Sequence, residues 1–200
     1  LALAGMDSLE VGMWTDVVES VDLEADRLEG TWTWDDKEGL LLSSTSGRSR
    51  MTLPVVMTGS YAVKVRLSRM SGRGAMMLAL PVDRGEVVLQ IDEKGFSGLA
   101  SIDGKGADDN DSTTTDLELE AKDDVYVETN VQIEGDQVEI RARVDGRSYV
   151  KWEGKISQLS ASPTWSSGQA GKIAFGSNGS QFAFESLQVK PMEDGSKRVR

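Results

Sequence analysis

Residues 125 to 152 read VYVETNVQIEGDQVEIRARVDGRSYVKW, and their pattern decides the fold. Within each of the first two segments of this stretch, apolar residues occupy alternate positions. They are Val125, Val127, Val131 and Ile133 in the first, and Val138, Ile140, Ala142 and Val144 in the second. A period of two predicts strands with one buried face and one wet face. Gly135 and the pair Asp145-Gly146 supply the positive φ angles that tight hairpin turns need. The stretch therefore predicts an antiparallel sandwich or barrel.

Composition limits both the size of the fold and its chemistry. Two hundred residues, 38% of them hydrophobic, suit one all-β domain whose core stands without disulfides. Cysteine is absent, which excludes disulfides and thiolate metal sites. Histidine is absent too, which excludes Ser-His-Asp and Cys-His catalysis and imidazole metal ligands. Any catalysis would rest on Asp, Glu, Lys, Tyr or Ser.

The charge balance and the chain ends bear on partners and location. A net charge of -11 disfavours nucleic acid and anionic lipid as main partners. No apolar run approaches the roughly 20 residues of a membrane helix, so we expect no membrane insertion. Ala2-Leu3-Ala4 resembles the small-residue end of a signal peptide. We therefore expect a segment of a longer protein that is extracytoplasmic or secreted.

The chain divides into three parts. We expect an irregular lead-in over residues 1–27, a sandwich of about a dozen short strands over 28–190, and a polar, frayed tail over 191–200. In the lead-in, Trp14 lies at helical spacing from three valines and predicts a helical turn, the valines being Val17, Val18 and Val21.

Two predicted strands have unusual patterns. Residues 74–80 are rich in Met and Leu, which predicts a strand buried on both faces. Near the end, Phe182 and Phe184 share one parity while Leu187 and Val189 share the other. A β-bulge at residues 185–186 would reconcile them, because one extra residue resets the alternation.

Several short motifs occur in an order that resembles a known family. They begin at Gly30 (GTWTW), Tyr61 (YAVKV), Lys151 (KWEG), Lys172 (KIAFGS) and Phe184 (FESLQV). In this order they resemble the concanavalin A-like lectin/glucanase jelly-roll domains of planctomycete type, related to laminin G-like modules and to the 3-keto-disaccharide hydrolase domain. The resemblance covers about residues 28–190. It implies an all-β jelly-roll of two curved antiparallel sheets, with carbohydrate binding as the commonest role, and it assigns no binding residue.

Three alternating carboxylates are the candidate catalytic groups if the protein is an enzyme. Asp116, Glu118 and Glu120 alternate with Leu117 and Leu119 in a strand predicted over 114–120. Laminarinase-type glycosidases of this fold carry a similar Glu-x-Asp-x-Glu pattern. Same-face residues lie about 6.5 to 7 Å apart along a strand, and rotamers could reach the roughly 5 to 5.5 Å of a retaining glycosidase. The alternative is that the leucines face the core and the acids face water.

An acidic loop is the candidate metal site. Asp108, Asp109 and Asp111 offer the oxygen ligands that calcium prefers. An EF-hand is excluded, because Thr114 stands where that loop needs glycine and no flanking helices are predicted. The choice lies between a looser calcium site and a solvated acidic turn.

The tryptophans and the outward polar residues are the candidate ligand-binding groups. Trp165, in a Ser-Pro-Thr-Trp-Ser-Ser loop, is either a binding platform or a cap on the sandwich. For Trp152, at the end of a hairpin, both roles also remain possible. Trp32 and Trp34 are expected in the core. The polar faces of the central strands would line a groove if their sheet is concave, and would form cross-strand charge pairs if it is convex: Lys64, Arg66, Glu128, Asn130, Gln132, Glu139, Arg141 and Arg143.

Asn130, Arg141 and Arg143 are therefore predicted ligand contacts, the two arginines suiting anionic sugars through bidentate hydrogen bonds. The sequence predicts a non-catalytic carbohydrate-binding or adhesion module of a larger bacterial protein, with a polysaccharide or glycan as partner. A glycoside-active enzyme and a structural protein-interaction domain are the alternatives. No cofactor is expected other than the calcium considered above.

Overall fold

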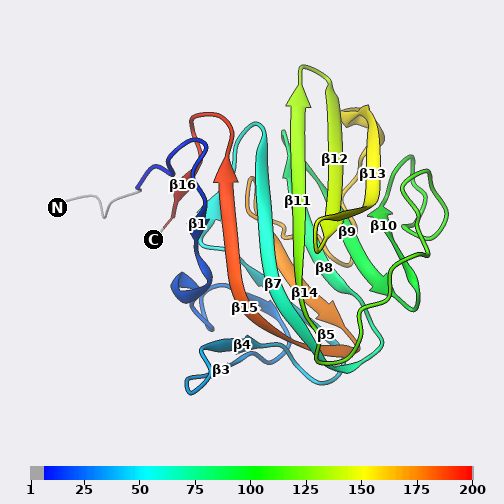
Figure 1. The fold of residues 1–200 in the computed structure, drawn as a ribbon. Helices are drawn as coiled ribbons and strands as arrows, with labels where there is room; N and C mark the ends of the chain where they lie inside the picture. Colours follow the sequence, from blue (N-terminus) through cyan, green and yellow to red (C-terminus); the bar gives the residue numbers. More distant parts are fainter. Residues whose placement is uncertain (1–6, 200) are drawn as a thin grey trace.

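The computed structural model describes residues 7–199, which form two large antiparallel sheets packed face to face (Figure 1). The prediction about Ala2-Leu3-Ala4 lies outside these residues. Within residues 7–199, 3₁₀ turns are the helical elements, η1 (Val18–Ser20) and η2 (Ile156–Gln158), and no helix is long and apolar enough to cross a membrane. The predicted all-β sandwich is confirmed, and η1 confirms the helical turn predicted in the lead-in.

One sheet has eight strands and the other has six. The eight-stranded sheet runs in the order β13 (Arg147–Lys155), β12 (Gln137–Val144), β11 (Asp124–Glu134), β7 (Tyr61–Gly72), β15 (Ser180–Pro191), β4 (Leu40–Leu42) and β3 (Thr33–Asp35), with β1 (Thr15–Asp16) paired to β15. The six-stranded sheet runs in the order β10 (Phe96–Ala100), β9 (Gly85–Glu93), β8 (Met76–Val82), β14 (Ala174–Asn178), β5 (Arg48–Thr52) and β2 (Arg27–Glu29). A small third sheet joins β16 (Lys197–Arg198) to β6 (Val55–Val56).

The core lies between the two sheets, where the inward-facing side chains of each strand pack against those of the other sheet. Val127 of β11 stands opposite Val65 of β7 and Val144 of β12, and all three are buried. At one end, Trp32 packs edge-on to Phe175 with ring centroids 5.3 Å apart. Such aromatic pairs add to the hydrophobic stabilisation of the core.

A β-bulge in β15 lets both halves of that strand face the core. Phe184 pairs with Leu67 of β7, whereas Ser186 pairs with Arg66, so Glu185 is the extra residue. Phe182 before the bulge and the apolar residues after it are all fully buried. This confirms the bulge predicted from the change of parity.

The outer face of the six-stranded sheet is closed by loops. Every residue of β8 is buried, as predicted for residues 74–80. The outward side chains form a second apolar cluster together with residues of two loops: Ala75, Met77, Ala79, Val88, Ala100, Ala107, Trp165 and Ala174. Ala107 comes from the loop 101–115 and Trp165 from the loop 159–171. The polar loops of the sequence therefore serve as a lid on this sheet.

Two expectations about local structure were wrong. Residues 114–120 form no strand, because only Thr114 bridges to Ser97 and the rest lacks a ladder partner. The tail is not frayed over its described part, because β16 pairs with β6 and Ser8 bridges to Lys197. Backbone pairing with distant segments thus stabilises ends that looked too polar to be ordered.

A buried ion pair joins the two sheets near the chain segment 114–122. The Arg69 guanidinium of β7 donates to the Asp92 carboxylate of β9 at 2.8 Å, and both side chains are about 5% exposed or less. Asp92 also accepts the backbone N–H of Leu119 at 2.8 Å, while Arg69 donates to the carbonyl of the same residue at 3.0 Å. The pair therefore holds the unpaired segment against the sandwich.

Candidate functional site

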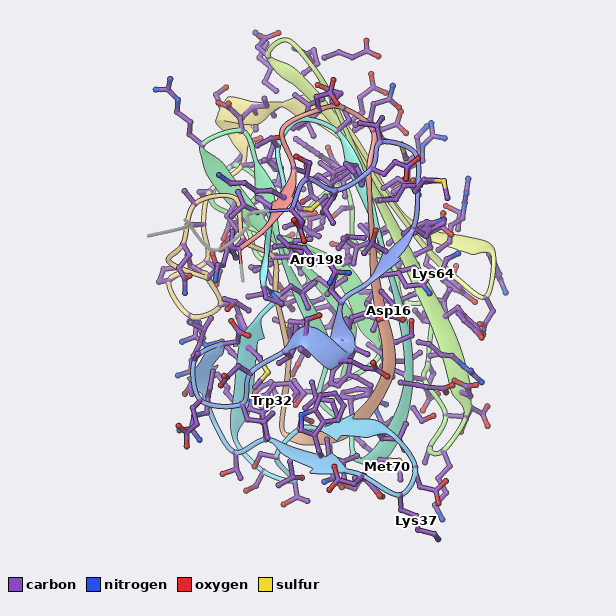
Figure 2. All side chains as sticks on the ribbon, turned by 90° about the vertical axis from the view of Figure 1, so that its left-hand side faces the viewer. Asp16, Trp32, Lys37, Lys64, Met70 and Arg198 are labelled. Carbon is purple, nitrogen blue, oxygen red and sulfur yellow. The ribbon has the colours of Figure 1, made fainter. Side chains whose placement is uncertain are left out.

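The outer face of the eight-stranded sheet is open to solvent across β15, β7, β11, β12 and β13. We call this surface the open face. Its outward residues align across the strands in rows, which are Ser186–Arg66–Tyr126, then Gln188–Lys64–Glu128–Arg143–Ser148, then Lys190–Ala62–Asn130–Arg141–Lys151. Figure 2, a view along the layers, shows Lys64 on the outer side of this sheet.

The open face carries several hollows, of which two bear on ligand binding. A hollow of about 330 Å³ is lined by residues of β7, β11, β12 and the turn after β12, which are Lys64, Tyr126, Glu128, Arg143, Asp145 and Gly146. Tyr126 is 43% exposed, so its ring presents an apolar face to this hollow. A second hollow of about 440 Å³ lies at the end of β11, and Asn130, Gln132 and Glu193 are among its lining residues. The hollow at Tyr126 offers an aromatic surface beside charged and hydrogen-bonding groups.

Trp14 is a second aromatic ring on the open face. The pairing of Thr15 with Val189 places β1 along β15 and carries Trp14 over the sheet. The Lys64 ammonium lies 4.6 Å from the ring centroid and the Lys190 ammonium lies 4.7 Å from it, both within cation–π range. The ring is half-buried, so part of it is available to a ligand.

Sequence reasoning missed this role of Trp14. Helical spacing grouped it with three valines that are buried in the core, whereas Trp14 lies on the opposite side of the eight-stranded sheet. The placement depends on a pairing between the two ends of the chain. No local pattern signals such a pairing.

Several charged groups of the open face are paired with one another. Lys64 pairs with Glu128 at 3.4 Å, and Arg141 pairs with Glu139 next to it along the face. Arg66 donates to Asp124 and Glu185, and the hydrogen bond to Asp124 raises the pKa of this guanidinium. The Arg66 guanidinium also lies 5.3 Å from the Tyr126 ring centroid. These contacts hold the ring and its surroundings in place.

Structural comparison identifies the fold. A protein of unknown function with a galectin-like fold from Bacillus subtilis superposes with a TM-score of 0.60 at 12% identity, covering 97% of this chain and 100% of that chain. Lectin II from Ulex europaeus gives 0.57 at 9% identity, covering 90% and 99%. A legume lectin-like domain from Entamoeba histolytica gives 0.57 at 10% identity, covering 90% and 97%. The fold is that of the concanavalin A-like lectins.

These comparisons concern the fold alone, because the identities are low. No protein-family model matches the chain, and no curated protein is similar to it in sequence. The predicted resemblance to the concanavalin A-like jelly-roll is confirmed at the level of architecture. Any function must be argued from the residues that this lectin fold presents.

The two tryptophans predicted as ligand contacts do not present open rings. Trp165 is 7% exposed and packs on Ala79 and Met77 in the loop-covered cluster. Trp152 is 6% exposed and belongs to the main core. The expectation of an exposed platform at Trp165 was wrong, because its loop folds back on the six-stranded sheet. The other reading, a cap on the sandwich, describes its position.

The other three predicted ligand contacts lie on the open face. Asn130 and Arg141 are cross-strand neighbours, and Arg143 stands opposite Glu128 in the adjacent row. Asn130 lines the larger hollow and Arg143 lines the one at Tyr126. Arg141, in contrast, is occupied by Glu139. The structure thus brings these polar residues onto one surface, with aromatic partners that the sequence did not indicate.

The candidate catalytic carboxylates lie away from the hollows. Asp116, Glu118 and Glu120 are exposed, while Leu117 and Leu119 between them are buried in the core. None of these carboxylates lines either hollow of the open face. The arrangement matches the alternative in which the leucines anchor the segment and the acids face water.

The candidate calcium loop is organised by its own hydrogen bonds. The Asn110 amide donates to the carbonyl of Leu99 at 2.7 Å and to that of Gly106 at 2.6 Å, while its oxygen accepts from Ser112. Asp108, Asp109 and Asp111 are exposed. Among residues 7–199, no cluster of three or more Asp or Glu side chains is placed to hold a metal ion. The hydrogen bond from Asn110 to Leu99 thus ties this loop to β10.

Proposed function

We propose that this protein is a non-catalytic carbohydrate-binding or adhesion module that binds a glycan along the open face. The strongest support is that loops cover the outer face of one sheet and leave the outer face of the other accessible to solvent. Loops bury the outer side of the six-stranded sheet, whereas the open face combines a hollow, the exposed Tyr126 ring, the half-buried Trp14 ring and rows of hydrogen-bonding side chains. A sheet face of this kind offers space for an extended polymer.

The chemistry of the open face suits sugars. Aromatic rings pack against the apolar C–H faces of a pyranose, and Tyr126 and Trp14 present such rings. Glu128, Asn130 and Gln188 lie between or beside them; the carboxylate accepts hydrogen bonds from sugar hydroxyls, and the two amides both donate and accept. Cross-strand pairing fixes the spacing of these groups, so little ordering entropy is lost on binding.

The proposal extends to the parent protein predicted from the sequence. We place the module in a larger, extracytoplasmic bacterial protein of planctomycete type, related to laminin G-like modules, which is where a glycan-binding domain meets polysaccharide. The glycosidase alternative gains no support, because its carboxylates lie outside the hollows. The acidic loop also gives calcium no assembled site in residues 7–199.

Binding assays with two aromatic variants test the proposal. A glycan array would identify a binding polysaccharide, and calorimetric titration would give its affinity. Tyr126→Ala and Trp14→Ala should each weaken binding about tenfold, since losing an aromatic contact worth about 1.4 kcal/mol corresponds to that factor. Phe96→Ala truncates a ring on the six-stranded sheet and should leave the affinity unchanged.

Two results would contradict the proposal. One is an array with no bound glycan for the folded protein. The other is equal loss of affinity in the Phe96→Ala control and in the two open-face variants, which would indicate a general effect on stability. Circular dichroism of each variant separates lost binding from lost folding.

A further inference from the structure

The two central rows of the open face differ in the sign of their charge from the whole molecule. The protein carries a net charge of -11. The two central rows of the open face nevertheless hold five cations, Lys64, Arg141, Arg143, Lys151 and Lys190, and one carboxylate, Glu128. Two positively charged rows on an otherwise acidic protein form a surface complementary to an anion.

Three of the five cations have no carboxylate partner. Lys64 and Arg141 are ion-paired, as described above. No ion pair to any residue in 7–199 engages Arg143, Lys151 or Lys190, and the nearest described partner of Lys190 is the Trp14 ring. Of the two carboxylates that line the hollow at Tyr126, Glu128 is paired with Lys64, and Asp145 accepts the backbone N–H of Tyr126 at 2.9 Å. The uncompensated charge of these two rows is therefore positive, and the carboxylates Glu139 and Glu153 lie in the adjacent row.

The unpaired cations are spread across the sheet instead of meeting at one point. Lys190 and Lys151 stand at opposite ends of one row, four strand spacings apart, which is about 19 Å at roughly 4.8 Å per step. Arg143 lies in the adjacent row on β12. This separation matches a ligand with repeated charges along an extended chain better than one compact anion.

We infer that the glycan taken by the open face is an acidic polysaccharide, with carboxylate or sulfate groups along its chain. The inference rests on the proposed function, which it deepens by naming the class of glycan. Arg143 and Lys151 face the acidic groups, and Lys190 binds one beside the Trp14 ring. The guanidinium of Arg143 suits a bidentate contact with either kind of group.

Matched pairs of polymers test the inference on the intact protein. Dextran sulfate and dextran share one backbone and differ in sulfate, and polygalacturonate and its methyl ester differ in carboxylate charge. At low ionic strength, at least one acidic polymer should bind at least tenfold more tightly than its neutral counterpart. Salt should weaken that binding, because exposed charges are screened. The polymer pair that shows this preference tells whether the open face recognises sulfate or carboxylate groups.

Charge-removing variants assign the effect to the open face. Arg143→Gln, Lys151→Gln and Lys190→Gln should each weaken binding of the acidic polymer about three- to tenfold. Lys37→Gln makes the same change of net charge on a side chain that is 88% exposed and lies at the lower end of the molecule, away from Lys64 (Figure 2), and it should bind like the unmodified protein.

The failures of the two proposals are distinguishable. Equal binding of neutral and charged polymers, with no effect of the three variants, overturns the acidic preference and leaves the carbohydrate-binding module standing. Tighter binding of a single-stranded oligonucleotide than of either acidic polymer overturns the inference in favour of another polyanion. Binding of none of the four polymers, nor of any glycan on the array, overturns both proposals.

Discussion

The two outer faces of this sandwich differ although their strands have the same period. On the six-stranded sheet the outward positions hold alanine, methionine and valine, and loops cover them. On the eight-stranded sheet the outward positions hold lysine, arginine and glutamate, and they remain solvated. Small apolar residues let a loop approach closely, whereas charged side chains would lose hydration beneath one. The residue types at the outward positions therefore decide which sheet remains accessible to a ligand.

The lid is held by specific hydrogen bonds as well as by apolar contact. The buried Glu86 carboxylate accepts the backbone N–H of Ser167 at 2.9 Å, and Arg50 donates to the carbonyl of Ser166 at 3.0 Å. Both bonds fix the loop that carries Trp165. On the open face, by contrast, polar groups pair with their neighbours on the same sheet or with solvent. The first sheet is a structural support and the second is a surface for recognition.

The largest expected effect comes from breaking the ion pair that joins the two sheets. Asp92→Ala should lower the free energy of unfolding by about 4 kcal/mol, because Arg69 would remain charged and buried without its partner. Urea denaturation measures the change. Glu139→Ala removes the carboxylate of an open-face pair and should cost less than about 1 kcal/mol. Equal losses of stability in the two variants would contradict the expectation that the buried ion pair contributes more than the exposed one.

Truncating the lid residue is the next largest change. Trp165→Ala should lower the free energy of unfolding by about 3 kcal/mol, since it leaves a cavity against Met77 and Ala79. Tyr126→Ala, on the open face, is the matched control and should cost much less, because its ring is already solvated. Chemical denaturation of both variants provides the test. A cost below about 1 kcal/mol for Trp165→Ala would show that the lid contributes little to stability.

Neutralising an unpaired cation of the open face should leave stability almost unchanged. Arg143→Gln removes no ion pair found within residues 7–199, so we expect a shift within about 0.5 kcal/mol in either direction. Thermal unfolding followed by circular dichroism measures it. A clear stabilisation at low salt would sharpen the comparison, because it would show that repulsion among the cations of this face costs folding energy. A clear loss of stability would instead indicate a structural role for this residue.

The smallest expected effect concerns pH. The Ser60 backbone N–H donates to Glu193 at 3.0 Å at the larger hollow and lowers the pKa of this carboxyl from its ordinary value of 4.5. A lowered pKa adds stability that is present above the ordinary value and is lost as the pH falls through the lower, folded-state value. Glu193→Gln should therefore lose less stability than the unmodified protein between about pH 6 and pH 3. Melting temperatures of both across this range measure the difference, and parallel curves would contradict it.

Sequence periodicity predicted the core and the bulge because both depend on local alternation. Val125 to Val144 and the parity change around Glu185 lie where the pattern placed them. The tryptophans were harder, because exposure depends on which loop folds over which sheet. Trp165 looked exposed from its polar neighbours but lies beneath them, and Trp14 looked like part of a helical face but lies across the outer surface. These placements follow from contacts between segments far apart in sequence.

The polar residues of the open face were identified, but their state of pairing was not. Alternation alone indicated that Asn130, Arg141 and Arg143 share a surface. It could not show that Arg141 is occupied by Glu139 while Arg143 has no such partner, because that depends on cross-strand register and rotamers. Lys190 and Lys151 entered the site only once the strand order placed β15 and β13 in the same sheet.

The meeting of the first and last described segments has a consequence for redesign of the chain. Ser8 bridges to Lys197, and the N–H of Arg198 donates to the carbonyl of Asp7 at 2.9 Å (Figure 1). A short peptide linking these segments would close the backbone into a ring with little distortion, and the chain could be reopened at the exposed turn of Gly135. Such a circular permutant would keep every strand of the open face while moving its points of attachment beside the ligand surface.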